Sequence, residues 1–159
     1  MTVIASQRRR TMVLVAVAAG SLACGPFGLA DLGGDELAKN RARWEALSIT
    51  SYEYEVARSC YCPPSSLGPV RVRVEDGVVT DRTFVNGTNT GSEEPGEWFP
   101  SVAGLFDLLA EAYERDAHQV EVTYDRDTGV PLDIYIDYDE YVADEELGLS
   151  VESLPVPVS

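Results

Sequence analysis

Residues 70–79 read VRVRVEDGVV, and this stretch decides the fold. Valine alternates with arginine over residues 70–74, which is the period-two pattern of a strand with one buried and one solvated face. Asp76 and Gly77 then form one of the strongest short signals for a two-residue β-hairpin turn. Residues 78–85 are therefore expected to return as the partner strand, in an antiparallel sheet that is wet on one side.

Two other parts of the chain show the same alternation and extend the sheet. Residues 51–58 alternate tyrosine and valine with glutamate, which predicts a half-buried strand upstream of the hairpin. Residues 120–124 and 132–138 alternate apolar with mostly polar residues, and a turn over residues 127–129 connects them. The sequence therefore predicts a second antiparallel hairpin.

Residues 147–154 are expected to add one short strand at an edge of the sheet. Pro155 and Pro157 follow this stretch, and proline lacks the backbone N–H that a central strand must donate. We therefore expect regular structure to end there and residues 155–159 to form a tail.

Two amphipathic helices are expected beside these strands. Asp35 is expected to be the N-cap residue of the first helix, and Ser101 caps the second. The first helix groups on one side Leu37, Ala38, Trp44 and Leu47. The second helix follows the 3.6-residue period with Val102, Leu105, Phe106, Leu109, Ala112 and Tyr113.

Together these elements predict the α+β class. We expect an antiparallel sheet of five or six strands with two helices packed on one face, in the order α-βββ-α-ββ(β). A chain of 159 residues has room for one such domain. The expected segments are a lipoprotein signal peptide at 1–23, a flexible tether at 24–34, a single α+β domain at 35–154 and a tail at 155–159.

The N-terminus has the pattern of a bacterial lipoprotein leader. Three arginines at residues 8–10 precede an apolar run over residues 12–22, which is too short to cross a bilayer. The run ends in Ser21-Leu22-Ala23-Cys24, which resembles a lipobox. Cys24 is therefore expected to be lipidated, and signal cleavage without lipidation is the alternative. The paired arginines leave the general and the twin-arginine export routes open.

The charge balance narrows the classes of partner. The chain has 27 acidic and 12 basic residues, a net charge of −15, and three of the basic residues belong to the leader. A protein this acidic repels nucleic acid and anionic lipid surfaces. No nucleic-acid partner is expected. Contact with the membrane is expected through the lipid anchor, on the extracytoplasmic face of the cell membrane or the outer membrane.

Several short motifs occur in a recognisable order over residues 37–154. They are Trp44, Tyr52-x-Tyr54, Cys60-x-Cys62-Pro63, Gly68-Pro69-Val70-x-Val72, Asp76-Gly77, Leu105-Phe106-Asp107-Leu108, Val122-x-Tyr124-Asp125, Gly129-x-Pro131, Ile134-x-Ile136-Asp137 and Ala143-Asp144-Glu145-Glu146. In these motifs the chain resembles a family of short bacterial lipoproteins, DUF6174, a domain of unknown function. The resemblance implies an extracytoplasmic, compact α+β domain, and it brings no activity, substrate or catalytic residue.

Cys60 and Cys62 form the most unusual local pattern. Two nearby thiols in an oxidising compartment are expected to pair as a structural disulfide. The backbone must turn there, because side chains two apart on a regular strand are too distant for a disulfide. Reduced buried thiols, a redox-active pair and a soft-metal site are the other interpretations.

Asp125-x-Asp127-x-Gly129 hints at a calcium-binding loop, which makes Asp125 and Asp127 weak metal candidates. An EF-hand loop requires glycine at its sixth position and glutamate at its twelfth, and this chain has Val130 and Ile136 there. Aspartate and glycine are also the residues that a hairpin turn favours. The turn is the preferred interpretation, and no metal is assigned.

Trp98 and Phe99 lie in a long polar loop, residues 86–100. Either they fold over the edge of the core, or they are exposed and recognise a partner, as aromatic residues commonly do at interfaces. The sequence leaves both readings open.

No pattern of catalytic residues stands out, and no cofactor is expected. The expected function is that of a non-catalytic, lipid-anchored envelope protein acting as an interaction or inhibitor-like module. It would present its polar sheet face and the loop at residues 86–100 to an envelope protein. The alternative is a redox or metal-handling lipoprotein that uses Cys60 and Cys62.

Overall fold

The computed structural model describes residues 32–60, 68–85, 98–142 and 144–158. The expected leader, Cys24 and Cys62 lie outside the described residues. The elements are helix α1 (Leu32–Ala46), strands β1 (Tyr52–Ser59), β2 (Val70–Glu75) and β3 (Val78–Phe84), helix α2 (Val102–Glu114), and strands β4 (Gln119–Tyr124), β5 (Pro131–Asp137) and β6 (Leu147–Pro157).

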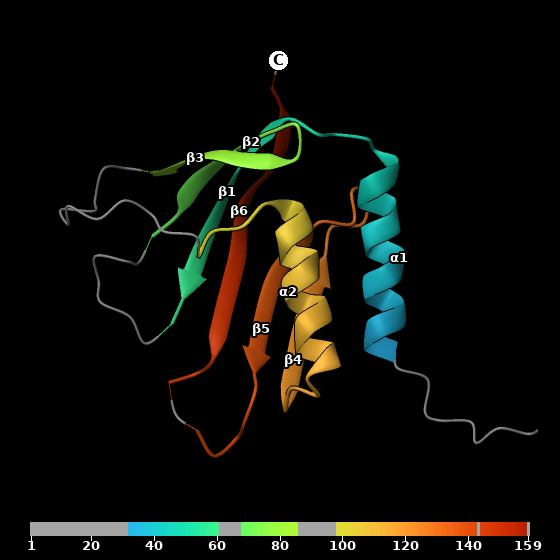
Figure 1. Ribbon diagram of the computed structural model, residues 1–159, viewed down its shortest axis with the longest axis vertical. Helices are drawn as coiled ribbons and strands as arrows, with labels where there is room; N and C mark the ends of the chain where they lie inside the picture. Colours follow the sequence, from blue (N-terminus) through green and yellow to red (C-terminus); the bar gives the residue numbers. More distant parts are fainter. Residues whose placement is uncertain (1–31, 61–67, 86–97, 143, 159) are drawn as a thin grey trace, which may run out of the picture.

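The six strands form one antiparallel sheet in the order β3-β2-β1-β6-β5-β4. Both helices lie on the same face of this sheet, side by side (Figure 1). We call the face turned away from them the outer face. The architecture confirms the predicted α+β class, with two helices on one face and the order α-βββ-α-βββ.

The DG hairpin has the geometry that its sequence predicts. Asp76 and Gly77 have φ angles of 49° and 81°, and a type I′ turn requires positive φ at both central residues. On β2 the valines Val70, Val72 and Val74 are fully buried, so the alternating residues divide between the core and the outer face. The hairpin therefore fixes which face of the sheet receives the helices.

The position of β6 contradicts the sequence prediction. The strand lies in the middle of the sheet, between β1 and β5, and was expected at an edge. It also continues through Pro157, so the expected tail at residues 155–159 begins too early.

The two prolines are compatible with β6 for local reasons. Strand β5 pairs with β6 only as far as Ser150, so the later part of β6 has a partner on one side only. Val158 donates its N–H to the Ser51 carbonyl oxygen at 3.1 Å. Since N–H groups alternate along a strand, the nitrogen of Pro157 faces the unpaired side. Pro155 lies where the β1–β6 register shifts, a bulge position that tolerates proline.

Helix α1 begins earlier than predicted. It starts at Leu32, three residues before the expected N-cap Asp35, so the tether expected at residues 24–34 is too long. Gly33 packs directly on the ring of Tyr113, where an added Cβ would lie 2.6 Å from Cε1. Tertiary packing therefore holds a first turn that its two glycines disfavour in isolation.

The buried side of α1 also differs from the expected one. Leu37, Asn40 and Trp44 are buried, whereas Ala38 and Leu47 are exposed. The side-chain amide of Asn40 makes its hydrogen bonds within the helix. Its Nδ2 donates to the backbone oxygen of Glu36, and its Oδ1 accepts from Arg43 at 2.7 Å. A polar residue thus occupies a core position that an apolar pattern cannot reveal.

Two buried tyrosines of β1 hold the N-terminus of α2 against the sheet. The Tyr52 hydroxyl accepts the N–H of Val102 at 2.9 Å, and the Tyr54 hydroxyl donates to the carbonyl oxygen of Pro100. The Ser101 hydroxyl accepts the backbone N–H of Gly104 at 3.1 Å, which confirms Ser101 as the N-cap. The start of α2 is therefore satisfied by β1 as well as by its own cap.

Candidate functional site

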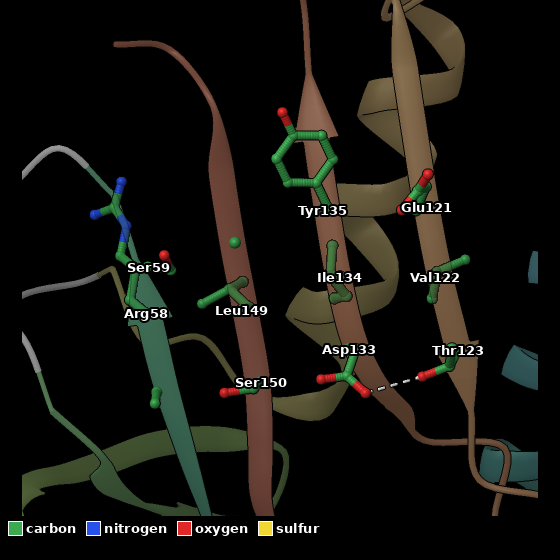
Figure 2. Close-up of a pocket in the computed structure, with 12 residues that line it drawn as sticks. Arg58, Ser59, Glu121, Val122, Thr123, Asp133, Ile134, Tyr135, Leu149 and Ser150 are labelled. Atoms are coloured by element: carbon green, nitrogen blue, oxygen red, sulfur yellow. Dashed lines mark hydrogen bonds between the residues drawn. The ribbon is translucent and has the colours of Figure 1, made fainter.

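An open groove crosses the outer face of the sheet. It has a volume of about 440 Å³ and spans β1, β6, β5 and β4 (Figure 2). The side chains of Ile134 and Leu149 point from its floor into the core, where both are buried. Their neighbours along each strand therefore point outward, on the side that the helices leave uncovered (Figure 1).

Strand register sets the outward side chains of this groove in two rows. One row holds Ala57, Ser150, Asp133 and Thr123, and the next holds Ser59, Gly148, Tyr135 and Glu121. Gly148 creates the depression between its neighbours, because a Cβ at this position would lie 3.1 Å from the Cβ of Ser59. A side chain there would fill the space between Ser59 and Tyr135.

The β4–β5 side of the groove is acidic. The carboxylate of Asp133 accepts from the Thr123 hydroxyl at 3.2 Å, and Glu121 accepts from the Gln119 amide at 2.8 Å. Both donors are neutral, so neither carboxylate loses its charge to an ion pair. Burial raises the pKa of the Tyr135 hydroxyl, and nearby carboxylates, Asp137 foremost, raise it further. These contacts indicate a negative potential at the groove.

The other half of the outer face is partly neutralised by its own ion pairs, in which two arginines contact three glutamates. Arg71 contacts Glu55 at 2.7 Å across β1 and β2. Arg73 contacts Glu53 at 3.0 Å and Glu75 at 2.8 Å. The arginines of the VRVRV stretch therefore offset much of the negative charge of the glutamates beside them, whereas no ion pair offsets the charge of Glu121 or Asp133 in the groove.

Trp98 and Phe99, proposed together as recognition residues, have opposite environments. Phe99 is 3% exposed and makes an edge contact with Phe84, with ring centroids 6.4 Å apart. Phe99 is therefore a core residue, which agrees with the alternative that this loop folds over the edge of the core and excludes Phe99 as an exposed contact residue. Trp98 is 67% exposed, and the guanidinium of Arg58 lies 4.6 Å from its ring centroid. A recognition role for Trp98 stays a prediction.

Asp125 and Asp127 belong to the β4–β5 turn. The Asp125 carboxylate accepts the Thr128 hydroxyl at 2.6 Å, the Thr128 N–H at 2.7 Å and the Asp127 N–H at 3.2 Å. These bonds, led by the Thr128 hydroxyl, lower the pKa of Asp125. The carboxylate stabilises the turn, in agreement with the preferred interpretation. Within the described ranges, no group of three or more metal-binding side chains occurs.

The cysteine predictions fall largely outside the described residues. Cys60 directly follows β1 and is disulfide-bonded. Its partner is not among the described residues, so the pairing with Cys62 and the lipidation of Cys24 stay predictions. In the part of the chain that the structure covers, no helix has the length and apolar character of a membrane span.

A second cavity, of about 580 Å³, lies between α1 and the β4–β5 turn. Its charged lining consists of Lys39, Arg43, Arg126, Asp35, Glu36 and Asp125. Equal numbers of basic and acidic side chains give it no net preference for either sign of ligand. The outer-face groove, with its acidic β4–β5 side, is therefore the better candidate for a site that selects a ligand by charge.

The sequence missed this groove because its halves are far apart in the chain. Alternation predicts a polar outer face, yet only the central position of β6 places Tyr135 two strands from Ser59. One local signal was available. An isolated glycine in a strand, here Gly148, marks close approach of a neighbour.

The model of DUF6174, described as a family of unknown function, matches residues 36–156. No curated protein and no solved structure matches the chain.

Proposed function

This chain belongs to the DUF6174 family, which has no assigned function, and from that premise we propose that it is a non-catalytic, lipid-anchored envelope module that binds a partner protein. The binding surface in this proposal is the outer-face groove. The lipid anchor is Cys24.

One observation carries the proposal: the helices cover one face of the sheet and leave a hollowed opposite face open to solvent. In the groove on that face, on β5, lies Tyr135, which is 36% exposed. Tyrosine is enriched at protein interfaces because it combines apolar area with a polar end. The hydroxyls of Ser59, Thr123 and Ser150 around it supply hydrogen-bonding groups.

The proposed location rests on the leader and on Cys60. A basic segment, a short apolar run and Cys24 follow one another as in exported lipoproteins. A disulfide at Cys60 agrees with an oxidising compartment outside the cytosol. An anchor at Cys24 places the folded domain a few residues from the membrane surface.

Replacement of the anchor cysteine tests the location. Cys24→Ser is expected to move the protein from the membrane fraction to the soluble fraction, because serine has no sulfur atom on which the thioether to the lipid can form. Fractionation followed by intact-mass measurement checks this result. Cys62→Ser is the matched control and should stay membrane-bound. A Cys24→Ser protein as firmly bound as the native chain would contradict the anchor.

Site-specific photocrosslinking in the native host tests the binding surface. A photoreactive residue at Thr123, in the groove, is expected to give a discrete adduct with one envelope protein, identified by mass spectrometry. The control position is Ala42, which is exposed on α1 on the opposite side of the sheet. Adducts that form equally from both positions, or from Ala42 alone, would argue against the groove.

A further inference from the structure

The carboxylates of the β4–β6 half of the outer face have no basic partner among the residues that the structure describes. The acids concerned are Glu121, Asp133 and Asp137, whose hydrogen-bond donors are the Gln119 amide, the Thr123 hydroxyl and a backbone N–H. None of these donors carries a positive charge, in contrast to the arginines that pair with the glutamates on β1 and β2. The groove offers this charge to a cation from outside the chain.

The ring of Tyr135 lies among these carboxylates. Figure 2 shows the ring nearly face-on over β5, with Glu121 beside it and Asp133 one pleat along the same strand. Tyr135 and Glu121 are directly opposite in the β4–β5 register. An aromatic face bordered by carboxylates is suited to an ammonium or guanidinium group, through cation–π attraction and charge-assisted hydrogen bonds.

Other aromatic rings near the surface already carry an arginine of this chain. The guanidinium of Arg58 lies 4.6 Å from the Trp98 ring centroid, and that of Arg115 lies 4.1 Å from the Tyr138 ring centroid. Over the described ranges, Tyr135 receives no such cation. Its ring face is therefore available to a cation that a partner supplies.

The groove is long enough for a short stretch of extended chain. Neighbouring strands lie about 4.8 Å apart, so the distance from β1 to β4 is about 14 Å, which about four extended residues cover. Arg58 is the basic residue among those that line the groove, and it lies at the β1 end, held on Trp98. The negative end, at β4 and β5, is where basic side chains of a bound segment would lie.

We infer that the outer-face groove binds an extended basic segment of the partner protein, with a lysine or arginine side chain over Tyr135 and beside Glu121. This inference rests on the proposed function and adds the chemistry of the partner. Charge complementarity selects the occupant, because the chain has a net charge of −15 and the groove carboxylates, unlike Glu53 and Glu55, form no ion pair with a basic residue in the described part of the chain. Such binding weakens as salt is added.

A labelled peptide in which lysine alternates with serine tests the inference. With the full chain purified in mild detergent, fluorescence anisotropy is expected to show binding of this peptide. The matched peptide with glutamine in place of lysine should bind at least tenfold more weakly. Raising the salt concentration from about 20 mM to about 300 mM should lower the affinity for the lysine peptide several-fold. Equal binding of both peptides would overturn the inference.

Variants locate the binding and separate it from overall charge. Tyr135→Ala and Glu121→Gln are each expected to lower the affinity for the lysine peptide at least fivefold. Tyr135→Phe keeps the aromatic ring and should bind the peptide as the native chain does. The controls are Glu45→Gln, the same charge change on α1, and Tyr141→Ala, at a tyrosine that is 87% exposed. Equal weakening by Glu45→Gln and Glu121→Gln would show that binding is non-specific and overturn the inference.

The peptide and crosslinking experiments together separate failure of the inferred basic ligand from failure of the proposed function. A specific adduct from Thr123 without lysine-peptide binding would leave the groove as a binding surface and refute its preference for cations. The absence of both would refute the proposed function together with the inference. Peptide binding that depends on Tyr135 and Glu121 supports both.

Discussion

A chain that stops at Glu146, and so lacks β6, is expected not to fold. In the part of the chain that the structure describes, strand β6 joins the two halves of the sheet, since it pairs with β1 on one side and β5 on the other. Its loss exposes two strand edges and removes the buried side chain of Leu149 from the core. The expected result is a chain without a cooperative unfolding transition by circular dichroism.

Two matched comparisons control this experiment. A chain that stops at Pro157 loses one backbone hydrogen bond, from Val158 to Ser51, and should fold. Within β6, Leu149→Ala should cost about 2–5 kcal/mol, because Leu149 is 5% exposed. Leu154→Ala, at a residue that is 39% exposed, should cost much less. A cooperative transition in the chain that stops at Glu146 would show that β6 is dispensable.

Gly129→Ala is expected to destabilise the domain by about 3 kcal/mol or more, through backbone strain and a clash. Gly129 has a φ of 78°, and an added Cβ would lie 2.4 Å from the backbone oxygen of Asn40 and 3.1 Å from the Cβ of Arg43. The neighbour is helix backbone and cannot rotate away, so α1 itself would have to shift. Urea denaturation, read as the change in midpoint at constant slope, measures the effect.

Gly77→Ala is the matched control for this substitution. Gly77 also lies in a hairpin turn with positive φ, at 81°, but an added Cβ meets no atom within 4 Å. Only backbone strain remains, about 1 kcal/mol. Equal losses at Gly77 and Gly129 would show that α1 accommodates the added methyl group at Gly129 without cost, which would contradict the predicted clash.

The elements of this fold could be predicted because their signals are local. Alternation over residues 51–58, 70–74 and 132–138 predicts strands that the structure contains, and the positive φ angles at Asp76 and Gly77 confirm the hairpin turn. In each case, neighbours in the chain are also neighbours in the sheet. Period and turn chemistry therefore contain the necessary information.

Strand order could not be predicted, because it depends on residues that are distant in the chain. The prolines after residues 147–154 favoured an edge strand, and the actual β6 meets their requirements through a register shift and a one-sided final segment. Both features arise only when β1 and β6 meet. The groove depends on the same pairing, so its polar face was predictable and its shape was not.

Adjacent aromatic residues illustrate the same limit at the site. Trp98 and Phe99 share one loop and similar chemistry, yet one lies on Arg58 at the surface and the other packs on Phe84 in the core. The backbone just before α2 decides between them, and the contacts that fix it come from Tyr54 and Arg82. Neither contact has a signature in the surrounding sequence.

The central location of β6 also has a consequence for biosynthesis. A ribosome or an export channel releases the chain from its N-terminus, so the other five strands emerge before the one that lies between β1 and β5. Until then the two unjoined halves display bare strand edges, which are prone to improper association. The two halves of the sheet are therefore joined late, when β6 becomes available, and a chaperone that covers their open edges until then protects the chain from improper association.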